Sequence, residues 1–329
     1  MADTPSSPAI QLAPFRIEPI FIARVWGFRD LRPWYNRVAA PDPIGEVWLT
    51  GDACRIATGP HKGERLGALF AEARDALLGA GTPPGSPLLI KVIFAREKLS
   101  VQVHPDDAMA RRCGEPHGKT ECWYALQAEP GAEVAAGLKP GTTLEQIRQE
   151  IQDGTLESSL HAIPVARGDM VFVDSGTVHS IWPGSILLET QQYSDTTYRI
   201  YDYGRPRELH IEKALEAAKL ATRAGKIEPQ TLADRTVLID VEYFRVERID
   251  VQSSRTSASL RGEGEKLGLA YLFAAQGAGR LSGDGFDPFD LPARGIVASP
   301  AASPEFVVED AGGADERLEL IRITPNWPG

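Results

Sequence analysis

The stretch from Lys98 to Tyr124 constrains the fold more than any other part of this sequence. It opens with apolar and polar residues in strict alternation, in the run LSVQVH of residues 99–104. This period of two is that of a half-buried β-strand, and it places Gln102 and His104 on the same face, roughly 7 Å apart. Pro105 ends the strand because it has no backbone N–H to donate.

A second strand-like run, GKTECWYAL of residues 118–126, follows after a polar loop. Its alternation places Glu121 and Trp123 on one face. The two neighbouring segments therefore supply an amide, an imidazole and a carboxylate. These are ligand types that a divalent metal takes in proteins.

The composition is that of an ordinary soluble globular protein. The chain has 329 residues, of which 43% are hydrophobic and 24% are charged. Its net charge of −10 argues against a general nucleic-acid binder. The charge does not exclude an anionic small substrate, which responds to local charge only.

Compartment signals favour the cytoplasm. The three cysteines form no CxxC pair and no even framework, which indicates a reducing environment. Residues 1–14 lack the basic-then-apolar pattern of a signal peptide. No apolar run approaches the ~18 residues that a membrane span needs, so we expect no membrane association.

Most of the chain is expected to be β-structure. Helical spacing of apolar residues predicts helices at about 63–79, 142–163 and 209–224. From Arg235 on, short strands alternate with Gly- and Pro-rich turns, which is typical of a sandwich or barrel. Lys91 interrupts the apolar strand PLLIKVIFA. It is either an edge lysine that reaches water along its stem or a cation directed into a site.

The segment Gly168–His179 fits the second metal motif of the cupin jelly rolls: glycine, five residues, proline, one residue, glycine, two residues, histidine. One departure is visible, because Asp174 stands where the motif has proline. The pattern predicts a strand, a tight glycine turn and His179 directed into a barrel.

Five further runs resemble the type I mannose-6-phosphate isomerases in their short bacterial form. They are LSVQVHPDD, GKTECWY, SGTVHSI, LLETQQYSDTTYR and IYDYGR, and they span about residues 88–212. The resemblance implies a bicupin-like fold with inserted helices. We expect a metal-binding catalytic domain at residues 1–234 and a metal-free cupin-like domain at residues 235–329.

The resemblance also implies a site. The metal ligands of that family correspond to Gln102, His104, Glu121 and His179, which would hold one Zn²⁺ per chain. Its catalytic residues correspond to Lys119 and Arg199, and we expect Lys91 and Asp195 to bind substrate. Without the resemblance, Asp195 and Arg199 would be interpreted as a surface ion pair contributing at most about 1 kcal/mol.

The implied reaction interconverts mannose 6-phosphate and fructose 6-phosphate through an enediol. The phosphate needs local cations, for which the candidates are Lys91, Lys119, Arg199 and Arg205. Two histidines and a carboxylate also describe the site of a non-haem iron oxygenase. A cupin that binds sugar phosphates without turnover is the other alternative, which Asp174 and Val47 (in the run GEVW) keep open. We expect a monomer or homodimer.

Overall fold

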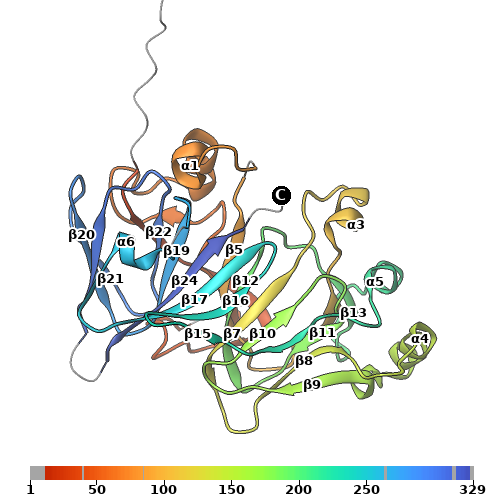
Figure 1. The fold of residues 1–329 in the computed structure, drawn as a ribbon. Helices are drawn as coiled ribbons and strands as arrows, with labels where there is room; N and C mark the ends of the chain where they lie inside the picture. Colours follow the sequence, from red (N-terminus) through yellow and green to blue (C-terminus); the bar gives the residue numbers. More distant parts are fainter. Residues whose placement is uncertain (1–11, 39–40, 84, 263–264, 313–315, 327–329) are drawn as a thin grey trace, which may run out of the picture. The chain divides into compact units, whose positions relative to one another are not determined.

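The structure, a computed structural model, describes residues 12–38, 41–83, 85–262, 265–312 and 316–326 (Figure 1). Contacts divide the chain into two compact units. We call residues 20–51 and 87–229 the central unit, and residues 1–19, 52–86 and 230–329 the flanking unit. Named strands pair only in antiparallel fashion within the described residues. The prediction of a mainly β protein with inserted helices is confirmed.

The central unit contains two antiparallel sheets. The first has the order β14-β10-β7-β12-β5-β3-β2 and the second the order β13-β6-β11-β8-β9. The strands of the first are β2 (Ile20–Phe28), β3 (Ile44–Trp48), β5 (Leu88–Phe94), β7 (Glu121–Ala128), β10 (Met170–Val173), β12 (Ser185–Gln192) and β14 (Gly225–Ile227). Those of the second are β6 (Val101–Val103), β8 (Glu133–Leu138), β9 (Leu160–Pro164), β11 (His179–Ile181) and β13 (Tyr198–Tyr201).

Strand β8 shows how the central unit is layered. Val134 and Ala136 belong to a core with Trp123 and Ile93 of the first sheet. Ala135, which points the other way in the pleat, belongs to a second core. That core is completed by helices on the outer face of the five-stranded sheet (Figure 1). The helical segments of this unit are α3 (Asp107–Arg112), α4 (Leu144–Asp153), η1 (Leu156–Ser159) and α5 (Ile211–Ala217).

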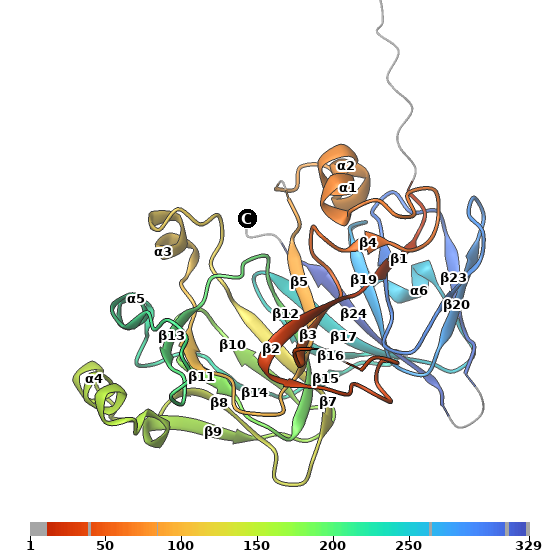
Figure 2. The same cartoon turned by 180° about the vertical axis from the view of Figure 1, so that it is seen from behind.

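The flanking unit has its own pair of sheets, of order β15-β16-β17-β24-β19-β22-β1-β4 and β18-β23-β20-β21. Between them lies a core that includes Leu272, Leu281, Val308 and Leu320. The larger sheet contains β1 (Phe15–Glu18), β4 (Arg55–Ile56), β15 (Gln230–Thr231), β16 (Thr236–Asp240), β17 (Phe244–Val251), β19 (Ala270–Gln276), β22 (Ile296–Ser299) and β24 (Leu318–Pro325). The smaller contains β18 (Ser254–Thr256), β20 (Gly279–Gly283), β21 (Phe289–Leu291) and β23 (Phe306–Asp310). Helix α1 (Leu66–Glu72) is followed directly by α2 (Arg74–Leu78), the two being joined at Ala73 (Figure 2), and α6 (Ser257–Leu260) is a single turn.

The two units divide the chain differently from the expected boundary at residue 234. Strand β1 pairs with β22, with Phe15 opposite Ala298, so the N-terminal strand joins the C-terminal sheet. The helices near residues 63–79 also belong to the flanking unit. Pairing between strands so far apart in the sequence leaves no local signal.

Two of the predicted helices are shorter than expected. Gly154, in the left-handed conformation, ends α4, and residues 160–164 form β9 because they pair with β8. Helix α5 ends at Ala217, where tertiary hydrogen bonds replace helical ones. The backbone N–H of Lys219 donates to the carbonyl of Gly176, and that of Arg223 to the carboxylate of Asp174.

No helix among the described residues is long and apolar enough to cross a membrane.

Candidate active site

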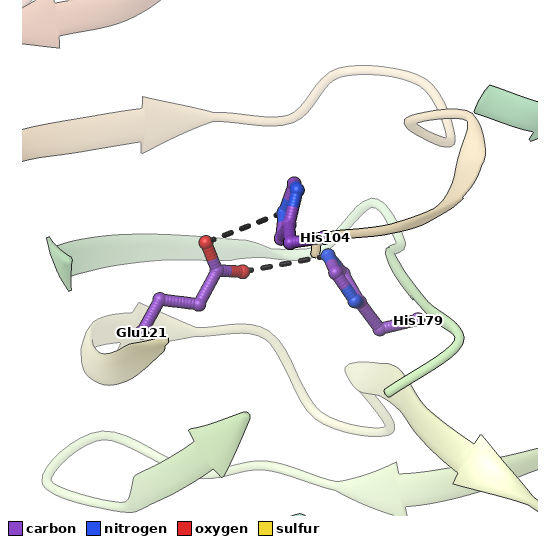
Figure 3. A group of neighbouring side chains, drawn as sticks. All are labelled: His104, Glu121 and His179. Carbon is purple, nitrogen blue, oxygen red and sulfur yellow. Dashed lines mark ion pairs between the residues drawn. The ribbon is translucent and has the colours of Figure 1, made fainter. Parts of the chain in front are cut away.

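Three of the predicted metal ligands converge from both sheets of the central unit (Figure 3). His104 directly follows β6, Glu121 begins β7 and His179 begins β11. The Nε2 atom of His104 lies 3.6 Å from Glu121 Oε2, and the Nε2 atom of His179 lies 3.4 Å from Glu121 Oε1. All three side chains are about 1% exposed, so water does not solvate the carboxylate.

The chemistry of this group fits a metal ion. The Nδ1 atom of His104 lies 2.9 Å from the carbonyl oxygen of Thr196, and that of His179 lies 2.8 Å from the carbonyl oxygen of Thr177. These contacts orient both Nε2 atoms toward Glu121, as outer partners do for metal-binding histidines. The buried His104 Nε2 and Glu121 Oε2 atoms have no hydrogen-bond partner in the described part of the chain.

The protonation states agree with ligation. Burial, together with the nearby Lys119, lowers the pKa of His104 well below its ordinary value. Burial likewise lowers the pKa of His179 to about 4. Both imidazoles are therefore neutral at pH 7, which is the form that can donate a lone pair to a metal.

Gln102 lies beside the same group. It is opposite His179 in the pairing of β6 with β11, and its Nε2 atom lies 3.2 Å from His179 Nε2. The two ends of a carboxamide have nearly the same shape, so a half-turn of the amide presents its oxygen at this place. Gln102 therefore stands where a fourth ligand can be supplied.

Lysines and carboxylates alternate next to Glu121. Lys119 Nζ lies 3.0 Å from Glu121 Oε2 and 3.7 Å from Glu189 Oε1. On the other side of Glu189, Lys91 Nζ lies 3.0 Å from the same oxygen. Lys91 also lies 3.9 Å from Glu46 Oε2. Lys91 is thus a buried cation among carboxylates and not an edge lysine that reaches water.

The pKa values of Lys91 and Glu46 are shifted by the charges around them. Burial alone would lower the pKa of Lys91, but Glu189 and Glu46 outweigh it and raise the pKa. Burial alone would raise the pKa of Glu46, but Lys91 and Arg24 outweigh it and lower the pKa to about 2. Both groups are therefore charged at pH 7.

A cavity of about 320 Å³ in the central unit borders these lysines and carboxylates. Gln102 and Lys119, which contact His179 and Glu121, are part of its wall. The other charged residues that line it are Arg24, Lys91, Arg199 and Arg207, with Glu46, Glu189 and Asp195. Arg205 is not part of the wall. The cavity offers a small anionic molecule a cationic wall beside the candidate metal ligands.

Comparisons with known proteins identify the family. Residues 16–149 match the family described as phosphomannose isomerase type I, catalytic domain. The mannose-6-phosphate isomerase of Streptococcus mutans is 37% identical over 256 residues, 72% of this chain and 80% of that protein. The mannose-6-phosphate isomerase ManA of Bacillus subtilis is 35% identical over 294 residues, 84% of this chain and 90% of that protein. The chain belongs to the type I mannose-6-phosphate isomerase family.

A solved member of the family shares the whole fold. The crystal structure of mannose 6-phosphate isomerase from Bacillus subtilis aligns with a TM-score of 0.83 at 29% identity. The alignment covers 95% of this chain and 100% of that one. The predictions of the family and of its cupin-type fold are thereby confirmed.

Several site residues in this family member were not selected from its sequence. Glu189 and Glu46 bind the buried lysines, and Arg24 and Arg207 line the cavity. Glu189 directly follows the apolar residues Ile186–Leu188 of β12, whereas Lys91 stands within the apolar strand β5. The two residues are opposite each other in the sheet. Arg207 stands in the polar run GRPRELH, where an arginine is unremarkable without the fold, whereas Arg24 interrupts the apolar run of β2 and had a signal like that of Lys91.

Proposed function

We propose that this chain interconverts mannose 6-phosphate and fructose 6-phosphate. The observation that carries the proposal is the buried His104–Glu121–His179 group beside a cavity with a cationic wall, in which His104 Nε2 has no hydrogen-bond partner among the described residues. Family membership supports it, since the S. mutans and B. subtilis relatives are named mannose-6-phosphate isomerases. The substrate is then a sugar phosphate.

We propose Zn²⁺ as the cofactor, one per chain, held by His104, Glu121, His179 and the amide oxygen of Gln102. Two neutral imidazoles and a carboxylate suit zinc, which accepts nitrogen and oxygen ligands. When bound, the metal supplies a Lewis acid that polarises the substrate's carbonyl and hydroxyl oxygens. The same donors also bind other transition metals, so the experiment below compares metals.

Lys119 is proposed to move the proton between C2 and C1 of the sugar. Lys119 lines the cavity, and its Nζ atom lies 3.7 Å from Glu189 Oε1. Before Lys119 acts as a base, its ammonium must release a proton, and Glu189 is placed to accept it. The amine then takes the proton from C2 of the aldose while the carbonyl oxygen O1 gains a proton, which gives the enediol. The ketose forms when the hydroxyl on C2 loses its proton and C1 takes the carbon-bound proton back from Lys119.

Arg199 is proposed to stabilise the negative charge that develops during the transfer. Its side chain makes one hydrogen bond among the described residues, from Nη1 to the carbonyl of Glu208 at 2.9 Å. Its buried Nε–H has no acceptor there. A guanidinium without a carboxylate partner can turn its donors toward a forming oxyanion. Lys91 and Asp195, on the same cavity wall, are proposed to contact the sugar.

The proposed compartment is the cytoplasm. All three cysteines lie within the described residues, and no disulfide joins any two of them. This agrees with a reducing environment.

The test follows fructose 6-phosphate formation by the purified chain before chelation, after chelation, and after restoring Zn²⁺, Mn²⁺ or Fe²⁺. We expect activity to vanish with chelator and to return best with Zn²⁺. Oxygen consumption with Fe²⁺ would instead favour an oxygenase. Binding of fructose 6-phosphate by the zinc-loaded chain without turnover would favour the non-catalytic cupin.

A variant separates the role of Arg199 from that of the metal ligands. Arg199→Ala should lower kcat by at least about 100-fold, the typical effect of removing one donor to a developing oxyanion. Its zinc content should equal that of the wild type. Loss of zinc in this variant would contradict the assignment.

A further inference from the structure

Three arginines from separate parts of the central unit line the cavity. Arg24 lies on β2, Arg199 on β13, and Arg207 in the segment after β13. We call them the arginine cluster. Burial lowers the pKa of Arg199, and the charges of Arg207 and Arg24 contribute to the lowering, so both guanidinium groups act electrostatically on Arg199 across the cavity they share. Such a group of like charges is relieved by an anion.

Two members of the cluster are held rigidly by buried carboxylates. Arg24 donates from Nε and Nη2 to the two oxygens of Glu46, at 2.8 and 3.1 Å. Arg207 donates from Nε and Nη2 to the two oxygens of Asp202, both at 2.6 Å. Each carboxylate also faces a second cation, since Glu46 faces Lys91 and Asp202 faces Arg205. The carboxylates therefore fix both arginines in place but leave positive charge at each.

Unused donors remain on all three arginines. A guanidinium carries five N–H bonds. Within the described residues, Arg207 uses neither N–H of its Nη1 atom. The Nη1 atom of Arg24 makes only a 3.4 Å contact with a carbonyl. Preorganised guanidinium groups with free N–H bonds match the oxygens of a phosphate, which accept bidentate hydrogen bonds.

The lysines of the cavity are less suited to a phosphate. Lys91 lies between Glu46 and Glu189, and Lys119 lies between Glu121 and Glu189. Both are nearly fully buried. A phosphate dianion next to either lysine would also meet the charge of Glu189, which lies 3.0 Å from Lys91 and 3.7 Å from Lys119.

We propose that Arg24 and Arg207 together bind the phosphate group of the substrate, which leaves Arg199 to act on the reacting carbons. This rests on the proposed function for the identity of the sugar, but the cluster itself predicts affinity for inorganic phosphate. In this assignment one part of the cationic wall, Arg24 and Arg207, binds the phosphate, and Arg199 stabilises charge during the reaction. It also makes the enzyme select phosphorylated over free hexoses.

The test compares Arg207→Gln and Arg24→Gln with Arg205→Gln in the full, zinc-loaded chain. Arg205 is a matched control, because it pairs with the same Asp202 as Arg207, at 3.2 Å, but does not line the cavity. Calorimetry measures the binding of inorganic phosphate and of fructose 6-phosphate. Circular dichroism confirms that each variant is folded, and Arg207→Lys and Arg24→Lys replace any variant that is not.

Each cluster variant should bind both ligands at least about 10-fold more weakly than the wild type, since a charge-assisted hydrogen bond is lost. In Arg205→Gln both affinities should change by less than about 2-fold. In turnover assays the cluster variants should mainly raise KM, whereas Arg199→Ala mainly lowers kcat.

Unchanged phosphate affinity in folded Arg24→Gln and Arg207→Gln would overturn the inference. So would a loss in Arg205→Gln as large as that in Arg207→Gln. These outcomes differ from a failure of the proposed function, in which the wild type itself would not isomerise mannose 6-phosphate. Phosphate binding by the wild type and its loss in the cluster variants would then still support the anion site.

Discussion

Both units bury charged side chains in their sheets, but they satisfy them differently. In the flanking unit, Glu247 of β17 is opposite Arg322 of β24 and accepts from its Nη1 atom at 2.6 Å. Arg245 donates to the same carboxylate at 2.9 Å. Arg235 lies 3.6 Å from it and donates to three backbone carbonyls. The carboxylate of this network meets a donor at each of its oxygens.

In the central unit the corresponding in-register pair is Lys91 and Glu189. Here Glu189 Oε1 and Glu121 Oε2 each face a lysine ammonium at 3.0 Å, whereas the buried His104 Nε2 has no hydrogen-bond partner within the described residues. The comparison teaches that buried charge by itself does not mark a site. The site is marked by the convergence of two imidazoles and a carboxylate beside a cavity, with the His104 Nε2 atom left for a ligand to complete.

The largest effect is expected from a substitution in the His104–Glu121–His179 group of the central unit. Glu121→Gln removes the charge that a divalent metal needs from this group, while it keeps the shape. Loss of a residue that only hydrogen-bonds to a metal ligand can lower metal affinity by about 100-fold. Loss of a ligand charge should lower it further, and turnover should fall with it. Metal analysis after dialysis and the isomerase assay measure both. Full zinc content in Glu121→Gln would show that the group is not the metal site.

The same chemical change in the flanking unit should act on stability alone. Glu247→Gln leaves Arg322, Arg245 and Arg235 without their shared carboxylate, and breaking a buried pair costs about 3–5 kcal/mol. Urea unfolding followed by circular dichroism measures the loss. Zinc content and turnover per folded molecule should equal those of the wild type. A loss of zinc in this variant would remove the distinction between the two networks.

Much of the site could be predicted because it depends on local patterns. The alternation of residues 99–104 places Gln102 and His104 on one face, and a glycine turn precedes His179. The departure at Asp174 is explained by the structure: its carboxylate accepts from the Thr177 hydroxyl at 3.0 Å and stabilises this turn. Local chemistry of this kind is visible in one sequence.

What escaped prediction depends on contacts between distant segments. Arg24 and Arg207 line one cavity only because β2 and the segment after β13 both border it. Strand β1 joins β22 across most of the chain. Residues 160–164 pair with β8 instead of continuing a helix, since tertiary pairing overrides the weak helical preference of so short a segment.

A smaller effect sharpens the comparison within the central unit. Lys91→Met and Glu189→Gln should each lower the free energy of unfolding by roughly 3 kcal/mol, because each leaves the partner's charge buried. The double variant should lose about 1–2 kcal/mol less than the sum, since these residues are in contact. Urea unfolding of all four chains gives the coupling. Turnover should stay low in the double variant, so the recovery of stability would not bring back activity. If the losses in the free energy of unfolding were strictly additive, the pairing of Lys91 with Glu189 would be contradicted.

The smallest effect concerns a feature that the two units share. Thr143 caps α4 by accepting from the backbone N–H of Gln146 at 3.1 Å, and Thr256 caps α6 by accepting from that of Ser259 at 3.1 Å. Thr143→Ala should cost about 1 kcal/mol, whereas Thr143→Ser should cost little.

Tryptophan fluorescence measures the cost at α4, because five of the six tryptophans belong to the central unit. Thr256→Ala should cost less, since α6 is a single turn and has few helical bonds to lose. Neither variant should change zinc content, because a helix cap acts locally in either unit. The two units differ in their buried charges and not in their caps. Zinc loss in Thr143→Ala would instead couple α4 to the site through the core that it shares with β6.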